Sequence, residues 1–478
     1  MGYPTVHPKG VTIYKPEKCW NGFTVFGVTG MGAVLMDMNG AEMRVWKGVY
    51  GFPHKLFPGG YLMGAHGERN PAYGFQDTLD LVQWDWDGNI VWKYDGTEYI
   101  EDPGEKAGWQ ARQHHDYQRE GNPVGYYAPG LDPKTDGGST LVLCHRNVSN
   151  PKISNYLLVD DIIVETDWEG KKIWEWACSD HFDELGFDQT AKNSLYHNPN
   201  LRTGGTLMGD WMHINSMSEL GPNKRYDAGD ERFHPKNIIC DGRETNILFI
   251  IDKKTGKIVW KVGPDYSQGP EKKLGWIIGQ HHAHMIPKGL PGEGNILVYD
   301  NGGWAGYGAV NPASKDGTKN AWRDYTRILE FNPVNMEIVW QHTPAEDGHS
   351  MPFNNSHFYS PFVSSAQRLP NGNTLICEGS EGRFLEVTAA HETVWEYLSP
   401  YNSMGSLNMV YRCYRAPYAW APQARHTPEI GIEPIECASW RVPGASNDRL
   451  SEVDIPDCVI HEAVDPSRSL CIGGIEED

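Results

Sequence analysis

The chain has 478 residues and a formal net charge of −20, from 42 basic and 62 acidic side chains. No run of Lys and Arg is dense enough to follow a phosphate backbone, so the sequence argues against a nucleic-acid partner. No window holds 18 consecutive apolar residues, so we expect no membrane-spanning helix and no membrane partner. The 53 glycines, 32 prolines and 18 tryptophans indicate a folded chain rich in strands and turns.

The N-terminus and the cysteines predict a cytoplasmic protein, as the chain is numbered. Residues 1–7 lack the charged and then apolar build of a signal peptide. The nine cysteines are scattered, with no Cys-x-x-Cys pair. Several lie inside apolar runs such as 141–144 and 374–377, where a buried reduced thiol is the ordinary state. A reducing compartment is therefore favoured.

Six copies of one phrase recur along the chain, each an acidic or polar turn followed by β-forming residues and a tryptophan. They run from 37 to 46, 85 to 92, 167 to 174, 252 to 260, 332 to 340 and 388 to 395. Each predicts a hairpin, because Gly or Asn in the turn tolerates positive φ between two strands. A second phrase, a turn followed by a strand, recurs at 58–63, 203–208, 292–297 and 370–375. Two hairpins per period give four strands per period.

Repeated four-stranded units predict an all-β fold, a six-bladed β-propeller whose blades pack face to face around a central axis. The phrase tryptophans lie 46 to 86 residues apart, so the longer intervals leave room for long insertions at the rim. The segments 216–236 and 302–323 are the expected insertions.

Both ends of the chain are expected to close the ring. The early strands 10–14 and 23–26 are expected to pair beside 409–414. Beyond about residue 420 the pattern fades into sequence rich in Pro, Ser and acidic residues. We therefore predict one propeller over residues 1–420 and an irregular C-terminal extension packed on its surface, residues 421–478.

Four stretches with histidine fall in four different tryptophan intervals. They contain His114 and His115, then His213, then His281, His282 and His284, and last His357. Because the innermost strands of a propeller line its axis, these stretches predict a central site lined by histidines. In an extended strand His282 and His284 share one face and His281 takes the other. Three unpaired imidazoles in one buried strand are costly without a task.

Each histidine also has a structural interpretation. His114 or His115 beside Asp116 fits a structural imidazole–carboxylate hydrogen bond as well as a catalytic one. His213 and His357, taken singly, fit structural positions. The spacing alone therefore leaves both interpretations open.

Several phrases resemble those of the bacterial arylsulfotransferase family. They are Asp210-Trp211-x-His213-x-Asn215-Ser216, Gln280-His281-x-Ala283, Asp300-Asn301-Gly302 and the stretch 366–376. The resemblance spans most of residues 10–420. Members are six-bladed propellers, often periplasmic, that move a sulfuryl group from one phenol to another without a nucleotide donor. The resemblance implies the same fold, a small aromatic substrate and no cofactor.

The resemblance also implies roles for the histidines. His357 is expected as the nucleophile that becomes sulfated, with His213 and His281 as acid–base and oxyanion partners and His282 as a further catalytic candidate. Neutral imidazole is a good nucleophile near pH 7, and a second histidine can protonate a departing phenolate. The remaining candidates, for binding substrate, are His114, His115, His284, Trp304 and Tyr307. The two aromatic residues fit either a pocket for a phenol ring or the core.

One arginine of the family pattern is missing. Relatives carry an Arg shortly after the Asp-Asn-Gly turn, where this chain continues 303–307 without one. The sulfuryl oxygens need a fixed positive partner in the transition state. Arg327 is the first candidate to replace it, with Arg243 and Arg112 as alternatives.

The surplus of histidines supports a second hypothesis, a metal-dependent oxidoreductase or lyase acting on an aromatic substrate. Neutral imidazoles converging on an axis suit copper, iron or zinc, and Asp116 could orient one of them from outside. The expected ligands are His115, His213, His281, His282 and His357. A third hypothesis, a propeller that only binds a protein partner, gives no reason for axial histidines. A homo-oligomer is compatible with the sequence.

Overall fold

The computed structural model describes residues 9–67, 76–101, 107–199, 209–303, 305, 307, 323–401 and 408–434. The chain divides into two units, Met1–Glu433 and Pro434–Asp478, and the first of them contains the propeller. No helix in the described ranges is long and apolar enough to cross a membrane.

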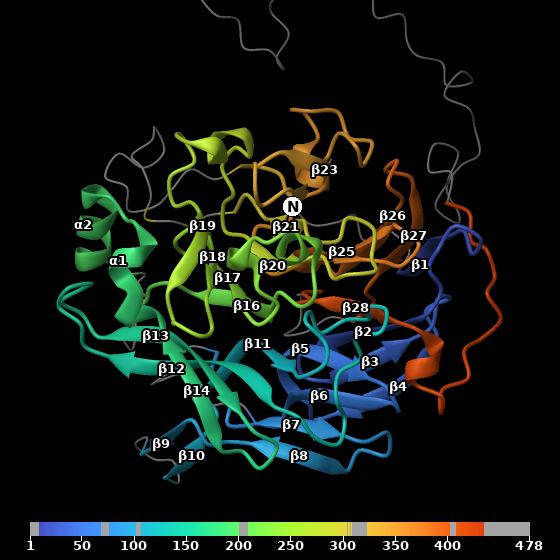
Figure 1. Ribbon diagram of the computed structural model, residues 1–478. Helices are drawn as coiled ribbons and strands as arrows, with labels where there is room; N and C mark the ends of the chain where they lie inside the picture. The colour runs from blue at the N-terminus through green and yellow to red at the C-terminus, as the bar shows by residue number, and fades with distance from the viewer. Residues whose placement is uncertain are drawn as a thin grey trace, which may run out of the picture. The chain divides into compact units, whose positions relative to one another are not determined.

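Six antiparallel sheets form the blades, which confirms the predicted six-bladed propeller (Figure 1). Blade 1 contains β28 (Cys413–Ala416), β2 (Phe23–Val28), β3 (Gly32–Met36) and β4 (Glu42–Lys47). Blade 2 contains β5 (Tyr50–Phe57), β6 (Tyr61–Ala65), β7 (Leu81–Trp84) and β8 (Ile90–Tyr94). Blade 3 contains β11 (Gln113–Arg119), β12 (Thr140–Val148), β13 (Leu158–Thr166) and β14 (Lys172–Ala177), and β15 (Gly209–Asp210) pairs with β13.

The other three blades complete the ring. Blade 4 contains β16 (Ile214–Glu219), β17 (Ile238–Gly242), β18 (Ile247–Ile251) and β19 (Ile258–Val262). Blade 5 contains β20 (His281–Met285), β21 (Ile296–Asp300), β22 (Arg327–Phe331) and β23 (Ile338–His342). Blade 6 contains β24 (Ser365–Arg368), β25 (Thr374–Glu378), β26 (Arg383–Val387), β27 (Thr393–Leu398) and β1 (Gly10–Tyr14).

Short elements lie between and beside the blades. A separate hairpin pairs β9 (Glu98–Ile100) with β10 (Gly108–Gln110). The α-helices are α1 (Phe182–Leu185), α2 (Gln189–His197) and α3 (Lys224–Asp227). Single 3-10 turns span Cys178–His181, Glu231–Phe233, Pro270–Lys273, Asn355–His357, Gly379–Glu381 and Tyr418–Trp420. The expected insertion 216–236 was wrong for its first four residues, which belong to an inner strand (Ile214–Glu219), and the rest contains helix α3. Most of 302–323 lies outside the described residues.

The two chain ends close the ring, but over two blades. Strand β2 pairs with β28, as expected, while β1 pairs with β27 at the outer edge of blade 6. The expectation that both early strands lie beside 409–414 was therefore wrong for β1. The reason is that β28 is an innermost strand with one edge toward the axis, so a single strand can pair beside it. Past residue 420, Ile432 exchanges two backbone hydrogen bonds of 2.8 Å with Tyr14.

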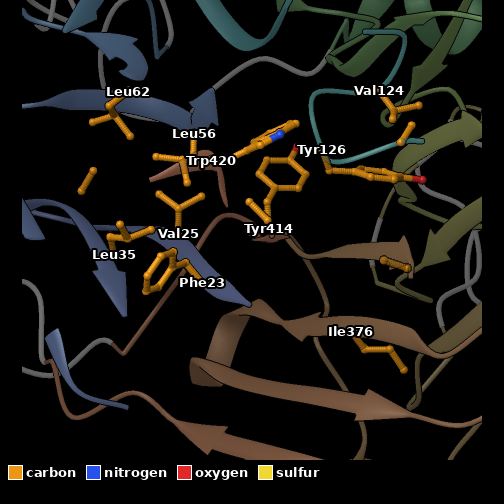
Figure 2. Close-up of a cluster of buried hydrophobic side chains, with 14 of the residues drawn as sticks. Phe23, Val25, Leu35, Leu56, Leu62, Val124, Tyr126, Ile376, Tyr414 and Trp420 are labelled. Atoms are coloured by element: carbon orange, nitrogen blue, oxygen red, sulfur yellow. The ribbon is translucent and has the colours of Figure 1, made fainter. Parts of the chain in front are cut away.

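The recurring tryptophans join each blade to the next. Six indole N–H groups donate to backbone oxygens in the next hairpin turn around the ring: Trp46 to Asp85, Trp92 to Trp168, Trp176 to Gly256, Trp260 to Pro333, Trp340 to Ala389 and Trp395 to Met38. The last bond returns from blade 6 to blade 1. In the third repeat the donor is Trp176, two residues beyond the Trp174 of the phrase. Apolar residues fill the space between blades, and Figure 2 shows Val25 and Leu35 facing Leu56 and Leu62.

Candidate functional site

The innermost strands of three neighbouring blades are irregular near their first residues. The register of β11, β16 and β20 shifts there. At or beside each shift a histidine takes a left-handed backbone, with φ of 50° at His115, 51° at His213 and 53° at His282. Such a conformation costs energy in a residue with a Cβ, and a bulge turns a side chain away from its regular direction. Three of the histidines that the sequence singled out therefore have a strained backbone.

Side chains from five blades meet at the start of the inner strands. We call Phe52, His115, His213, His281 and Tyr411 the axial cluster. The ring of His115 lies 4.6 Å from His213, 5.1 Å from Phe52 and 5.6 Å from Tyr411. The ring of Tyr411 lies 4.3 Å from Phe52 and 6.4 Å from His281. His213 and Tyr411 keep 8% of their surface exposed, so this cluster is buried but not sealed.

His213 is held by a carboxylate. Its Nδ1 lies 2.5 Å from Oδ2 of Asp210, the residue three positions earlier in the family motif. Burial alone would raise the pKa of Asp210, but the interaction with His213 holds that pKa below its ordinary value. The carboxylate is therefore ionised and accepts the Nδ1 proton, which leaves the lone pair of His213 on Nε2. Arg243 donates its backbone N–H to the carbonyl oxygen of His213 at 3.1 Å.

His281 is fixed through both ring nitrogens. Nδ1 lies 2.7 Å from Oδ1 of Asn301, and Nε2 accepts the backbone N–H of Val363 at 3.1 Å. Asn301 donates in turn to the carbonyl oxygens of Ser360 and Val363. Burial, followed by the charge of Arg243, holds the pKa of His281 well below its ordinary value. His281 is a neutral side chain that joins blade 5 to the loop before β24.

The rings of His282 and His284 lie 4.5 Å apart, but the regular alternation that the sequence predicted does not hold here, because the register of β20 shifts between His281 and His284. His284 contacts the hydroxyl of Tyr126 through Nε2 and the carbonyl oxygen of His282 through Nδ1, each at 2.8 Å. Burial lowers the pKa of His284 to about 4. Nδ1 of His282 has no hydrogen-bond partner among the described residues. Figure 2 shows Tyr126 on a loop that reaches toward Tyr414 of β28.

Asp116 does not orient a histidine. Its Oδ1 accepts from Nζ of Lys55 at 2.6 Å and its Oδ2 from Nη1 of Arg412 at 2.9 Å. Burial would raise the pKa of Asp116, but the two cations hold it below its ordinary value. A carboxylate between two cations is the stronger electrostatic arrangement, so the expected pairing with His114 or His115 is replaced by a buried ionic triad.

His114 points away from the axial cluster, into blade 3. Its Nδ1 lies 2.9 Å from Nδ1 of His115, and its ring stacks on His145 with centroids 3.5 Å apart. His145 of β12 contacts Asp77 through Nδ1 at 2.5 Å. Asp161 of β13 lies beside both imidazoles. Burial and the nearby Asp210 raise the pKa of Asp161 well above its ordinary value.

Sequence reasoning missed His145, Asp77 and Asp161. The one signal for them was the pair Asp160-Asp161 inside an otherwise apolar strand, because acidic residues are seldom fully buried without a partner.

His357, the expected nucleophile, is exposed on its 3-10 turn. Its ring lies 5.0 Å from His349, a loop residue before it. Among the described contacts no ring of the axial cluster touches it. The five ligands of the metal hypothesis therefore do not converge, since His357 is exposed and both nitrogens of His281 are bonded.

The three candidate arginines differ in position. Arg327 binds Asp300 at 2.7 Å from the third strand of blade 5, and Arg112 binds Asp77 at 2.8 Å. Arg243 follows β17, is bonded to the backbone of His213 and lowers the pKa of His281. Of these three candidates, Arg243 is the one beside the axial cluster, and Arg412, which was not among them, donates to the hydroxyl of Tyr411 at 3.2 Å.

The structure describes only one of the two aromatic candidates, Tyr307 and Trp304. Tyr307 is buried within an apolar cluster that also holds Trp211 and Met212, so it belongs to the core. Trp304 lies outside the described residues.

Comparison with known proteins decides the family. The family described as Arylsulfotransferase (ASST) matches residues 133–403, more than half of the chain. The chain belongs to the arylsulfotransferase family. Search of the curated proteins finds no match to this sequence.

Solved structures are similar to this propeller at low identity. A protein of unknown function from Bacteroides caccae shares 11% identity over 83% of this chain and 99% of its own, with a TM-score of 0.42. The β-propeller domain of Cps50 (Swd1) from Myceliophteria thermophila shares 10% identity over 84% of this chain and 90% of its own, with a TM-score of 0.37. Streptogramin B lyase shares 10% identity over 83% of this chain and 85% of its own, with a TM-score of 0.34.

Proposed function

We propose that this arylsulfotransferase passes a sulfuryl group between two phenols through a covalent intermediate on His213. The observation that carries the proposal is the Asp210–His213 pair at the start of β16. A carboxylate that holds Nδ1–H directs the Nε2 lone pair outward and stabilises the cationic ring formed after attack. His357 has no such partner among its described contacts and lies on an exposed turn.

In the first half-reaction, Nε2 of His213 attacks the sulfur of an aryl sulfate. The N–S bond forms as the S–O bond to the aryl group breaks, and the phenolate leaves with the bonding electrons and takes a proton from water. Arg243 is the cation we assign to the sulfuryl oxygens, where negative charge shifts during transfer. Phe52 and Tyr411 supply aromatic faces for the phenol ring.

In the second half-reaction, the acceptor phenol loses its proton to His115 and its oxygen attacks the sulfur. The N–S electron pair returns to Nε2 of His213, and His115 releases the proton to solvent. Burial, followed by the nearby His213, holds the pKa of His115 well below its ordinary value. His115 is therefore neutral before the reaction, and because the lowered pKa also makes it a weak base, it takes the phenol proton only as the new S–O bond forms. Neither half-reaction needs a cofactor.

The proposal is tested by trapping the intermediate. The full chain is mixed with a phenyl sulfate in the absence of acceptor, and intact mass is measured after rapid quenching, followed by peptide mapping under mild conditions. We expect one added SO₃ group on the peptide that contains His213. His213→Asn should remove the adduct and lower turnover by about 100-fold or more.

His357→Asn is the matched comparison, because the sequence alone favoured that residue. It should keep both the adduct and most of the turnover. An adduct on His357, or an adduct that survives His213→Asn, would show that the nucleophile is wrongly assigned.

A further inference from the structure

Three ligand atoms converge in blade 3, outside the axial cluster. Nε2 of His114 lies 3.3 Å and Nε2 of His145 lies 3.7 Å from Oδ1 of Asp161. The three residues come from the adjacent strands β11, β12 and β13, and their ligand atoms all lie within 4.8 Å of one another. All three side chains are at most 1% exposed.

These atoms are left without ordinary partners. Nε2 of His114, Nε2 of His145 and Oδ2 of Asp161 are buried and have no hydrogen-bond partner in the described structure. The 3.3 Å contact between His114 and Asp161 lacks the alignment of a hydrogen bond. Buried polar atoms in native proteins are nearly always satisfied, so three at one point indicate a missing partner.

The surroundings hold the two imidazoles as metal ligands are usually held. Nδ1 of His145 contacts Asp77, which is fixed by Nε of Arg112 at 2.8 Å. Nδ1 of His114 contacts His115. A histidine ligand typically gives its second nitrogen to a carboxylate or another polar group, which fixes the tautomer and aims the free nitrogen at the ion.

We propose that His114, His145 and Asp161 bind one divalent first-row transition metal ion, with Zn²⁺ as the reference ion. Two imidazoles and one carboxylate are a common donor set for such ions. Bonds of 2.0–2.1 Å in a tetrahedral site require ligand atoms roughly 3.3 Å apart, close to the spacing at Asp161. The rings now stack with 12° between their planes, so binding tilts them until both lone pairs meet the ion.

This site differs from the metal hypothesis drawn from the sequence, with which it shares no ligand. The ion would tie the first three strands of blade 3 together and neutralise a buried carboxylate. The ion does not touch His213, but with Nε2 of His114 on the ion, Nδ1–H of His114 donates to Nδ1 of His115 and leaves the proton of His115 on Nε2. The bound ion would therefore slow the proton transfer assigned to His115 above, without changing the nucleophile. Its test is a binding measurement, and the inference stands or fails independently of the nucleophile.

The experiment uses the full chain, stripped with chelator and dialysed. Calorimetric titration with ZnCl₂ should give one site per chain, and Co²⁺ should give a visible ligand-field spectrum with the same stoichiometry. Asp161→Asn and His145→Gln should each weaken Zn²⁺ binding by roughly 100-fold or more, since each removes a ligand. Asp77→Asn keeps all three ligands and should weaken binding about 10- to 100-fold.

His342→Gln is the matched control. His342 is also buried, and its Nε2 also lacks a hydrogen-bond partner, but it lies in β23 of blade 5. It should leave Zn²⁺ binding unchanged. Circular dichroism should show that each variant is folded. If a ligand variant fails to fold, Asp77→Asn still tests the site, because it keeps all three ligands. Failure of the wild-type chain to bind one Zn²⁺, or unchanged Zn²⁺ binding by folded Asp161→Asn and His145→Gln, would overturn the site.

Discussion

At the scale of single residues, a carboxyl group recurs at a similar position in three blades, and its pKa is lowered in one blade and raised in the other two. Asp300 and Glu378 end the second strands of blades 5 and 6, and Asp241 is the last residue but one of the second strand of blade 4. Each accepts a backbone N–H from a neighbouring segment. Arg323 and Arg327 hold the pKa of Asp300 below its ordinary value despite burial. Burial raises the pKa of Asp241 to about 6 and that of Glu378 to about 7. All three carboxyl groups bind a backbone N–H, but two arginines outweigh burial at Asp300, whereas burial dominates at Asp241 and Glu378.

Asp241 should make the stability of the fold depend on pH. Its pKa is about 6 when folded and about 4 when unfolded, so the folded state binds more protons between these values. The free energy of unfolding therefore falls as pH rises from about 4 to 6, by about 3 kcal/mol for this group, and stays lower above that range. Asp241→Asn removes the ionisation.

The measurement is thermal unfolding of both proteins from pH 4 to pH 7. Asp241→Asn loses hydrogen bonds at every pH, so it should be less stable than wild type at pH 4. The deficit should shrink as pH rises, because only the wild-type side chain ionises. A deficit that stays constant or grows across this range would contradict the raised pKa.

At the scale of elements, the tryptophan repeat explains how blades are held in order. Each indole lies on the fourth strand of its blade, counted from the axis, and donates to a turn of the next blade. These bonds couple neighbouring sheets whose described strands do not pair with one another. Every repeat contains both a turn and a tryptophan. Its tryptophan donates to the turn of the next blade, and its turn accepts from the tryptophan of the blade before, so one repeated phrase specifies both partners of the contact. This is why the phrase was sufficient to predict the number of blades.

Trp260→Phe tests that coupling. Trp260 is 5% exposed, and its Nε1 donates to the carbonyl oxygen of Pro333 at 2.9 Å. Phe keeps most of the apolar contact but leaves a buried carbonyl without its donor. We expect a loss of about 1–3 kcal/mol in the free energy of unfolding, measured by denaturant titration. Trp109→Phe, at an exposed residue of the β9–β10 hairpin, is the control and should change little; equal effects would refute the coupling.

The site was less predictable than the fold. Motif residues His213 and His281 lie at the axis because the same repeat that builds the blades also places their inner strands. His357 was misjudged as an axial residue because the inner strand of blade 6 begins at Ser365, eight residues later, and local sequence does not show where a loop becomes a strand. Asp116 was assigned to a histidine because Lys55 and Arg412 are distant in sequence. His145 and Asp161 meet His114 only through strand pairing.

At the scale of the whole molecule, an ionic triad crosses the axis. Lys55 comes from blade 2, Asp116 from blade 3 and Arg412 from the segment that leads into β28 of blade 1. Arg412 also donates to the carbonyl oxygen of Asn215 in blade 4. The triad thus joins four blades, and one of its members belongs to the last segment needed to close the ring.

Asp116→Asn should destabilise the closed propeller as a unit. The amide leaves two buried cations without a counter-charge, and removing one partner of a buried pair typically costs about 3–5 kcal/mol. Calorimetry should show one lowered transition for the propeller, because the triad connects blades on both sides of the closure. Lys55→Met added to Asp116→Asn removes one uncompensated cation and should recover part of the loss. Asp227→Asn breaks an exposed pair with Lys288 and should leave the transition unchanged. If Asp116→Asn behaves like this control, the axial charges do not hold the ring together.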